Sequence, residues 1–247
     1  MNLALLTLLL ALPVVLTGLV FLSLKIKGKN LRFLLAFSAA YLFAISVTHL
    51  LPECYEGTNT KTVGMFILIG FFIQIVIEYF SAGIEHGHVH AHSDSCKKHL
   101  PYGMITGLYL HSLLEGLPIY QSSNVEMANS ILTTQQSLIF GITLHNIPIA
   151  IAFVTLLTEH NASKLKALLL LIGFALMAPL GCFVSYVLNT FGVQNYDGFL
   201  KLSFGLVIGI FLHISTAIMF ETSENHKYNL AKIMSMIAGV FLAALIS

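Results

Sequence analysis

The sequence predicts an all-α membrane protein with eight transmembrane helices in a single transmembrane domain, residues 1–247. Of the 247 residues, 57% are hydrophobic and only 9% are charged, whereas soluble domains have about a quarter of their residues charged. The apolar residues form stretches of about 20, the length that crosses the hydrocarbon core of a bilayer. The formal net charge of +1 gives no basic surface for nucleic acid.

The eight helices follow from the apolar stretches and the polar connections between them. We expect them at residues 2–24, 31–52, 63–84, 101–121, 134–158, 165–189, 198–221 and 228–246. The first stretch has no basic segment before it and no small-residue cleavage site, so we expect a retained helix rather than a signal peptide.

The basic residues predict the orientation of these helices. If the N-terminus lies outside, ten of the 12 basic residues fall on the inner side: Lys25, Lys27, Lys29, Arg32, Lys97, Lys98, Lys164, Lys166, Lys227 and Lys232. Such a bias marks the cytoplasmic side of a membrane protein. An even number of helices then places both termini outside the cytoplasm, and we expect a multi-pass protein of the plasma or inner membrane.

Two neighbouring helices carry ionisable side chains at membrane depth. His111 and Glu115 lie four residues apart, which places them on one face of a helix. His145 lies in the middle of the next apolar stretch. Because ionisable groups inside a bilayer are costly unless they have a partner or a function, these three residues predict a divalent metal site. The alternative is that each histidine is a buried core residue that bonds to a carbonyl.

Prolines and a glycine accompany the same residues. Pro118 has no N–H, so we expect it to free the Leu114 carbonyl, and Pro148 likewise to free the Leu144 carbonyl. Freed backbone carbonyls at membrane depth are typical of a transport pathway. Gly116 should let a neighbouring helix approach closely.

Further ionisable residues lie near the ends of the expected helices. His49 and Glu53, spaced by four, close the second helix at its outer end and predict an entrance for metal ions; a merely polar helix end is the alternative. His213 and Glu221 in the seventh helix predict an inner exit, and the alternative for His213 is simple packing. Glu78 lies near the inner surface, where it can snorkel toward water.

The connection at residues 84–101 has the composition of a metal-binding tract. Its alternating histidines favour weak, exchangeable binding: His86, His88, His90 and His92. The alternative is a solvated polar loop without a ligand.

Taken together and in order, these motifs resemble the ZIP family of divalent-metal transporters over essentially the whole chain. The resemblance rests on the histidine-rich connection and on four motifs: His49-Leu50-Leu51-Pro52-Glu53, His111-Ser112-Leu113-Leu114-Glu115-Gly116, His145-Asn146-Ile147-Pro148 and Met177-Ala178-Pro179-Leu180-Gly181. It implies that helices 1–3 and 6–8 are inverted repeats around helices 4 and 5. It also implies inward transport of Zn²⁺ or of a similar ion such as Fe²⁺, Mn²⁺ or Cd²⁺, a homodimer in the lipid bilayer, and no organic cofactor.

The resemblance also assigns site residues. His111, Glu115 and His145 align with ligands of the family's primary metal site. Ser112 and Asn146 align with positions of a second site in members that bind two ions.

Departures from the two-metal pattern point to a single ion. Leu114 stands in place of a proline, and Ile149 and Ala178 stand where two-metal members have glutamates. Without these two carboxylates the second site is incomplete. The chain therefore resembles the branch of the family with one metal site.

Two other functional classes deserve comparison with transport. An intramembrane metal-dependent hydrolase would be expected to carry His-Glu-x-x-His, which this sequence lacks, so we do not expect an enzyme. A metal sensor without transport would bind ions but would give no flux across liposomes. Imidazole and carboxylate ligands with an open coordination position favour transit over a structural role.

Overall fold

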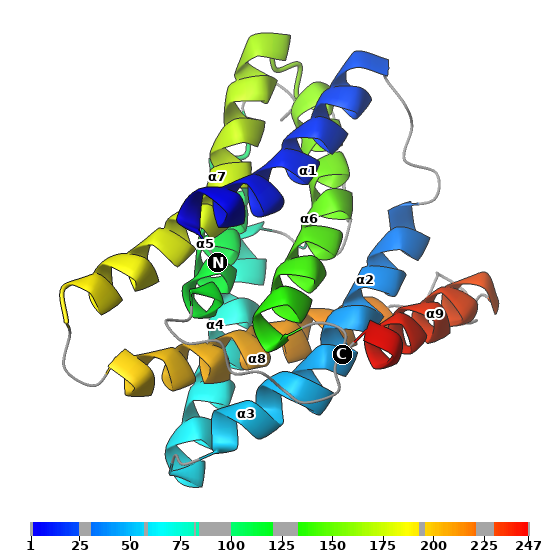
Figure 1. Ribbon diagram of the computed structural model, residues 1–247. Helices are drawn as coiled ribbons and strands as arrows, with labels where there is room; N and C mark the ends of the chain where they lie inside the picture. Colours follow the sequence, from blue (N-terminus) through cyan, green and yellow to red (C-terminus); the bar gives the residue numbers. More distant parts are fainter. Residues whose placement is uncertain are drawn as a thin grey trace.

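The computed structural model describes residues 2–24, 31–56, 59–81, 83, 100–120, 133–192, 196–220 and 230–246, which are helical apart from turns and short connections (Figure 1). The α-helices are α1 (Leu3–Leu24), α2 (Leu31–Ile45), α3 (Leu51–Tyr55), α4 (Thr60–Ser81), α5 (Tyr102–Gly116), α6 (Thr134–Glu159), α7 (Lys164–Thr190), α8 (Tyr196–Phe220) and α9 (Leu230–Ile246). A π-helical turn, Ser46–Leu50, joins α2 to α3, and a 3₁₀ turn, Leu117–Ile119, follows α5. The predicted all-α class is confirmed for the described residues.

Six segments in the described part of the chain are long and apolar enough to cross a membrane. One of them, Leu31–Tyr55, combines α2, the π turn and α3. Helices α5 and α9 are shorter, with 15 and 17 residues. The chain is therefore a multi-pass membrane protein, and eight crossings stay a prediction.

Two predicted helices differ from the observed ones because of proline. The second helix extends past Pro52 to Tyr55, and it does so through the π turn. The fourth helix tightens into the 3₁₀ turn at Pro118. The expectation that Pro118 frees the Leu114 carbonyl is wrong, because the N–H of Leu117 donates a hydrogen bond to that oxygen. In a 3₁₀ turn the N–H bonds to the carbonyl three residues earlier, whereas in an α-helix it bonds to the carbonyl four residues earlier.

The helices pack in two groups. In the first, which we call the ligand group, α1 packs on α6 and α7, and α5 packs on α7. In the second, the partner group, α4 packs along α8 and α2 along α9 (Figure 1). The two groups meet where α2 lies against α6 and α4 against α5. The contacts occur in matching pairs: α1 packs on α6 as α7 packs on α5, and α4 packs on α8 as α9 packs on α2. An inverted repeat of the predicted helices 1–3 and 6–8 would produce this pattern.

Glycines bring backbones into direct contact inside each group. A Cβ on Gly116 of α5 would lie 2.1 Å from the Ala178 carbonyl oxygen of α7, which agrees with the predicted close approach. A Cβ on Gly70 of α4 would lie 1.9 Å from the Leu206 carbonyl oxygen of α8. Between the groups the contacts are looser: the atoms nearest to a Cβ on Gly141 of α6 are side-chain atoms of α2, from 2.9 Å away, and a Cβ on Gly107 of α5 would lie 3.2 Å from the Ile77 carbonyl oxygen of α4. Small residues that let backbones touch are typical of helix association in membranes.

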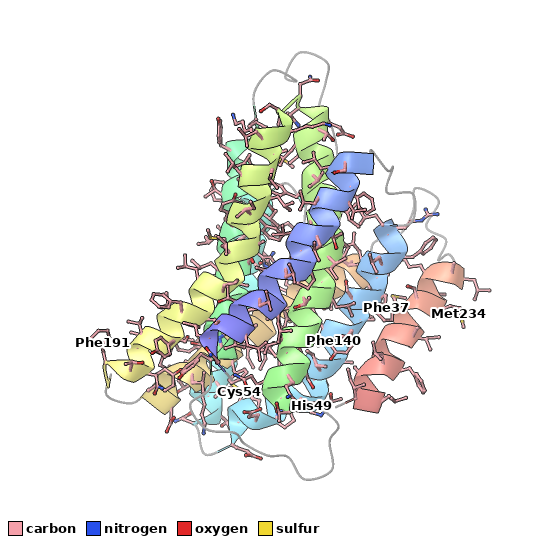
Figure 2. All side chains as sticks on the ribbon, turned by 45° about the horizontal axis from the view of Figure 1, so that its top comes forward. Phe37, His49, Cys54, Phe140, Phe191 and Met234 are labelled. Atoms are coloured by element: carbon pink, nitrogen blue, oxygen red, sulfur yellow. The ribbon has the colours of Figure 1, made fainter. Side chains whose placement is uncertain are left out.

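The apolar side chains divide between an interior and a surface that suits lipid. Phe153 and Phe174 pack together in the interior, with ring centroids 5.8 Å apart. Phe191 and Met234 are exposed and lie at opposite edges of the molecule (Figure 2). An exposed apolar surface of this kind is stable in lipid, where no water has to be ordered around it.

Candidate metal site

Three potential metal ligands converge in the interior of the protein. His111 and Glu115 come from α5 and His145 comes from α6, and their ligand atoms all lie within 4.8 Å of one another. All three side chains are fully buried. His111 and Glu115 share one face of α5 because they are one helical turn apart. The structure therefore brings together the residues that the sequence predicted as primary ligands.

The electrostatics of this cluster suit a cation. The Nε2 atom of His111 lies 3.1 Å from Oε1 of Glu115. Neither carboxylate oxygen of Glu115 has a hydrogen bond of good geometry within the described residues. A buried carboxylate whose hydrogen bonds are incomplete is destabilising by about several kcal/mol. A divalent cation that binds both Glu115 and the imidazoles would offset this cost.

A glutamine from α4 contacts the first histidine. The Nδ1 atom of His111 lies 3.2 Å from Oε1 of Gln74, which is fully buried. Gln74 is not among the residues that the sequence motifs predicted. A signal was present, since an amide in the middle of an apolar stretch is costly in lipid and marks a functional position.

A serine from α2 contacts the second histidine. The Nδ1 atom of His145 lies 3.4 Å from Oγ of Ser38, which is also fully buried. The same hydroxyl donates a hydrogen bond to the Leu35 carbonyl at 3.1 Å. Ser38 is not among the predicted residues either, and no sequence signal identifies it, because serine is frequent at helix contacts in membranes.

The residues that the resemblance aligns with a second metal site follow the histidines of the cluster in the sequence. Ser112 and Asn146 are both buried, each one residue after a histidine of the cluster. Asn146 Oδ1 has no hydrogen-bond partner within the described residues. Ile149 and Ala178 are buried as well. Buried apolar side chains thus occupy the two positions at which the resemblance places the carboxylates of a second site.

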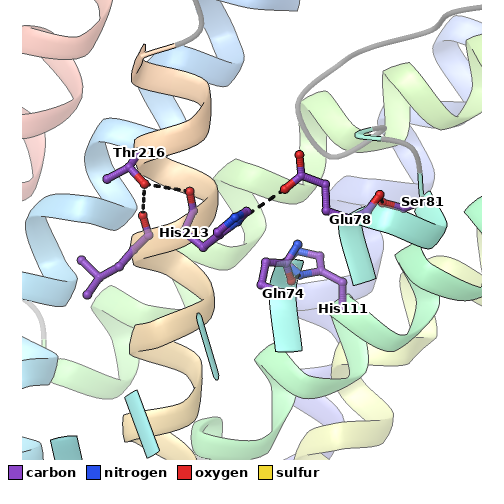
Figure 3. Close-up of polar contacts among 7 residues, drawn as sticks. Gln74, Glu78, Ser81, His111, His213 and Thr216 are labelled. Atoms are coloured by element: carbon purple, nitrogen blue, oxygen red, sulfur yellow. Dashed lines mark hydrogen bonds and ion pairs between the residues drawn. The ribbon is translucent and has the colours of Figure 1, made fainter. Parts of the chain in front are cut away.

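A second histidine–carboxylate pair lies between α4 and α8. His213 Nδ1 is 3.5 Å from Oε2 of Glu78, and the two side chains are 13% and 32% exposed. The imidazole also packs edge-on against Phe71, with ring centroids 4.9 Å apart. Figure 3 shows Gln74 and Glu78 on the same side of α4, toward His111 and His213 respectively. From the sequence, Glu78 was expected to extend toward water at the inner surface, and its pairing with His213 was not predicted.

The predicted entrance residues lie in two different elements, the π turn and α3. His49 lies in that turn, and its Nδ1 is 2.6 Å from Oγ1 of Thr48. Glu53 lies in α3 and accepts a hydrogen bond from Thr134 at the start of α6. No ion pair joins His49 to Glu53 in the described part of the chain, because a π turn shifts the register that a regular helix would give.

The remaining predicted residues lie outside the described residues. They are Glu221 of the proposed exit and the four histidines of the connection, His86, His88, His90 and His92.

Comparison with protein families adds one finding. A family model described as ZIP Zinc transporter matches residues 98–247. The matched region runs from just before α5 through α9, so it contains all three residues of the cluster. A search of curated proteins gave no match.

Proposed function

Because this chain belongs to the ZIP zinc transporter family, we propose that it carries Zn²⁺ into the cytoplasm through a site for one metal ion. Members of this family are transporters of divalent metal cations rather than enzymes, and that general function holds for the chain. The choice of Zn²⁺, the inward direction and the single ion are our proposal.

One observation carries the proposal: three buried ligands from α5 and α6 have their ligand atoms within 4.8 Å of one another. Two imidazoles and a carboxylate suit Zn²⁺, and they suit Fe²⁺ and Mn²⁺ as well. Three protein ligands leave a coordination position open, so the ion can exchange. In this proposal Glu115 supplies the negative charge, while His111 and His145 complete the site.

The pathway follows from the polar residues on either side of the cluster. In the predicted orientation, His49 and Glu53 lie toward the outside and attract the hydrated ion. The ion then leaves toward the cytoplasm past His213 and Glu78, which lie 3.5 Å apart near the inner ends of α8 and α4. Glu221 and the histidines of the 84–101 connection continue this path to the cytoplasm.

Movement of the two helix groups would open the site to alternate sides. All three ligands belong to the ligand group, and side chains rather than backbones fill the α2–α6 contact at Gly141. Transporters with repeated halves expose a fixed site by such relative movement. We propose that the ligand group moves against the partner group while each keeps its internal glycine contacts.

Binding of one ion follows from the apolar residues beside the cluster. Ile149 and Ala178 leave Ser112 and Asn146 without the carboxylates that a second ion requires. We further propose a homodimer in the plasma membrane with both termini outside.

Flux through purified protein tests the proposal. Proteoliposomes that contain the wild-type chain should accumulate ⁶⁵Zn, and those with His111→Ala should accumulate it at the rate of empty liposomes. A panel with Fe²⁺, Mn²⁺ and Cd²⁺ measures the preference among ions. Saturable Zn²⁺ binding without any flux would show a sensor and would contradict transport.

The number of ions is measured separately. Anomalous scattering at the zinc edge should show one fully occupied ion at the cluster. A second fully occupied ion beside Asn146 would contradict the single-ion site.

A further inference from the structure

We propose that Gln74 and Ser38 are positioning residues that keep the proton of His111 and of His145 on Nδ1, so that Nε2 of both rings faces the metal ion. This inference rests on the proposed function, since it concerns how the same cluster holds its ion. Neither residue is a metal ligand in the proposal. Each acts through the histidine that it contacts.

The contact between Ser38 and His145 determines the direction of one hydrogen bond. The hydroxyl of Ser38 has one proton, and it donates that proton to the Leu35 carbonyl at 3.1 Å. Its oxygen can then only accept from Nδ1 of His145, which is 3.4 Å away. His145 therefore carries its proton on Nδ1, and the lone pair of its ring lies on Nε2.

The contact between Gln74 and His111 leads to the same tautomer. Nε2 of His111 is the ring atom that faces Glu115, at 3.1 Å. A metal ligand must have a free lone pair, so a ring that binds the ion through Nε2 keeps its proton on Nδ1. The carbonyl oxygen of the Gln74 amide lies 3.2 Å from Nδ1 and accepts that proton.

The same arrangement thus occurs twice, on two different helices. Ligating histidines commonly donate their second N–H to a protein oxygen, which fixes the tautomer and the orientation of the ring. Here one oxygen comes from α2 and the other from α4, and both side chains are fully buried. Both helices belong to the partner group, whereas the ligands belong to the ligand group. The orientation of both imidazoles consequently depends on the register between the two groups.

Two variants remove one acceptor each with little change of shape. Gln74→Met removes the oxygen near His111, and Ser38→Ala removes the oxygen near His145. Loss of such a partner lowers metal affinity by about 10–100-fold, and we expect this loss in Zn²⁺ titrations of each purified variant. Gln74→Glu keeps an acceptor oxygen near His111, so it should bind Zn²⁺ more tightly than Gln74→Met does.

Matched controls have buried side chains of the same kind that contact neither histidine. Gln135→Met removes an amide that donates to the Ile119 carbonyl, and Ser203→Ala removes a hydroxyl that donates to the Phe199 carbonyl of its own helix. Both controls should bind Zn²⁺ as the wild type does.

Nuclear magnetic resonance of ¹⁵N-labelled histidine reads the tautomer directly. In the metal-free wild type, the His145 ring should show a protonated Nδ1, and once Zn²⁺ is bound the His111 ring should show it too, with signals assigned from His111→Asn and His145→Asn. Gln74→Met should change only the His111 signals, and Ser38→Ala only the His145 signals. Unchanged tautomers in these variants would overturn the inference even if affinity fell, because the residues would then act by packing alone. Absence of Zn²⁺ binding by the wild type would instead contradict the proposed function.

Discussion

The buried cluster on α5 and α6 and the histidine–glutamate pair between α4 and α8 contain the same chemical groups in different surroundings. In the cluster, His111, Glu115 and His145 are fully buried. In the pair, Glu78 is 32% exposed and His213 is 13% exposed. The cluster offers three ligand atoms to one ion, whereas the pair offers two.

This difference shows how one protein can both hold an ion and release it. A buried carboxylate is destabilised without a cation, so the cluster gains most from binding. A partly exposed pair gains much less, because water already solvates its charge and screens the interaction. In the proposed function, the ion therefore binds at the cluster and departs past the pair.

The largest expected effect comes from removing the charge of the cluster. Glu115→Gln keeps the shape of the side chain but leaves the ion without its only carboxylate. Uptake of ⁶⁵Zn by proteoliposomes should fall by about 100-fold or more, the size typical of a broken buried ionic interaction. Glu159→Gln at the exposed end of α6 is the control and should transport normally. Normal uptake by Glu115→Gln would show that the transported ion does not bind at the cluster.

A second test concerns the backbone that supports the cluster. Gly116→Ala would place a Cβ 2.1 Å from the Ala178 carbonyl oxygen and force α5 away from α7. Such overpacking lowers the free energy of unfolding by about 1–3 kcal/mol, which thermal unfolding in detergent measures. Gly64→Ala is the matched control, since its Cβ would meet only the Tyr55 hydroxyl at 3.8 Å. Equal melting temperatures for the two variants would show that α5 and α7 are not in close contact.

A smaller effect is expected from the pair. His213→Ala and Glu78→Gln should each lower the maximal rate of uptake about 2–5-fold, because a partly exposed pair contributes less than about 1 kcal/mol. The affinity for Zn²⁺ at the cluster should stay the same.

The double variant should be no slower than either single one, since both changes break the same interaction. Thr216→Val on α8 serves as the control, because within the described residues its hydroxyl bonds to carbonyls of its own helix. A loss of Zn²⁺ affinity equal to that of the cluster variants would place the pair in the primary site.

The smallest expected effect tests which side of the membrane each region faces. The sequence Asn161-Ala-Ser163 between α6 and α7 is an acceptor for N-glycosylation only outside the cytoplasm. In the predicted orientation it lies inside, so removal of N-glycans from protein made in eukaryotic cells should leave its mass unchanged. A glycan on Asn161 would show that the true orientation is the reverse of the predicted one, with the His213–Glu78 pair on the outer side.

The sequence alone was sufficient to identify the residues of the cluster. The spacing of four between His111 and Glu115, together with the place of His145 in the next apolar stretch, predicted that the three residues meet. Spacing alone did not predict the backbone around His49 and Glu53, because His49 lies in a π turn and Glu53 in α3. It failed again at Pro118, where a 3₁₀ turn satisfies the carbonyl that was expected to be free.

The sequence by itself determined that the chain is a bundle of membrane helices with a buried histidine–carboxylate site, because lipid requires long apolar stretches and makes each polar exception informative. Only the tertiary structure decided which residues orient that site and where a second pair forms. Ser38 and His145 are far apart in the sequence, as are Glu78 and His213, and their contacts depend on how each helix is rotated and shifted against its neighbour. Local periodicity determines the face of a helix, and packing determines what that face meets.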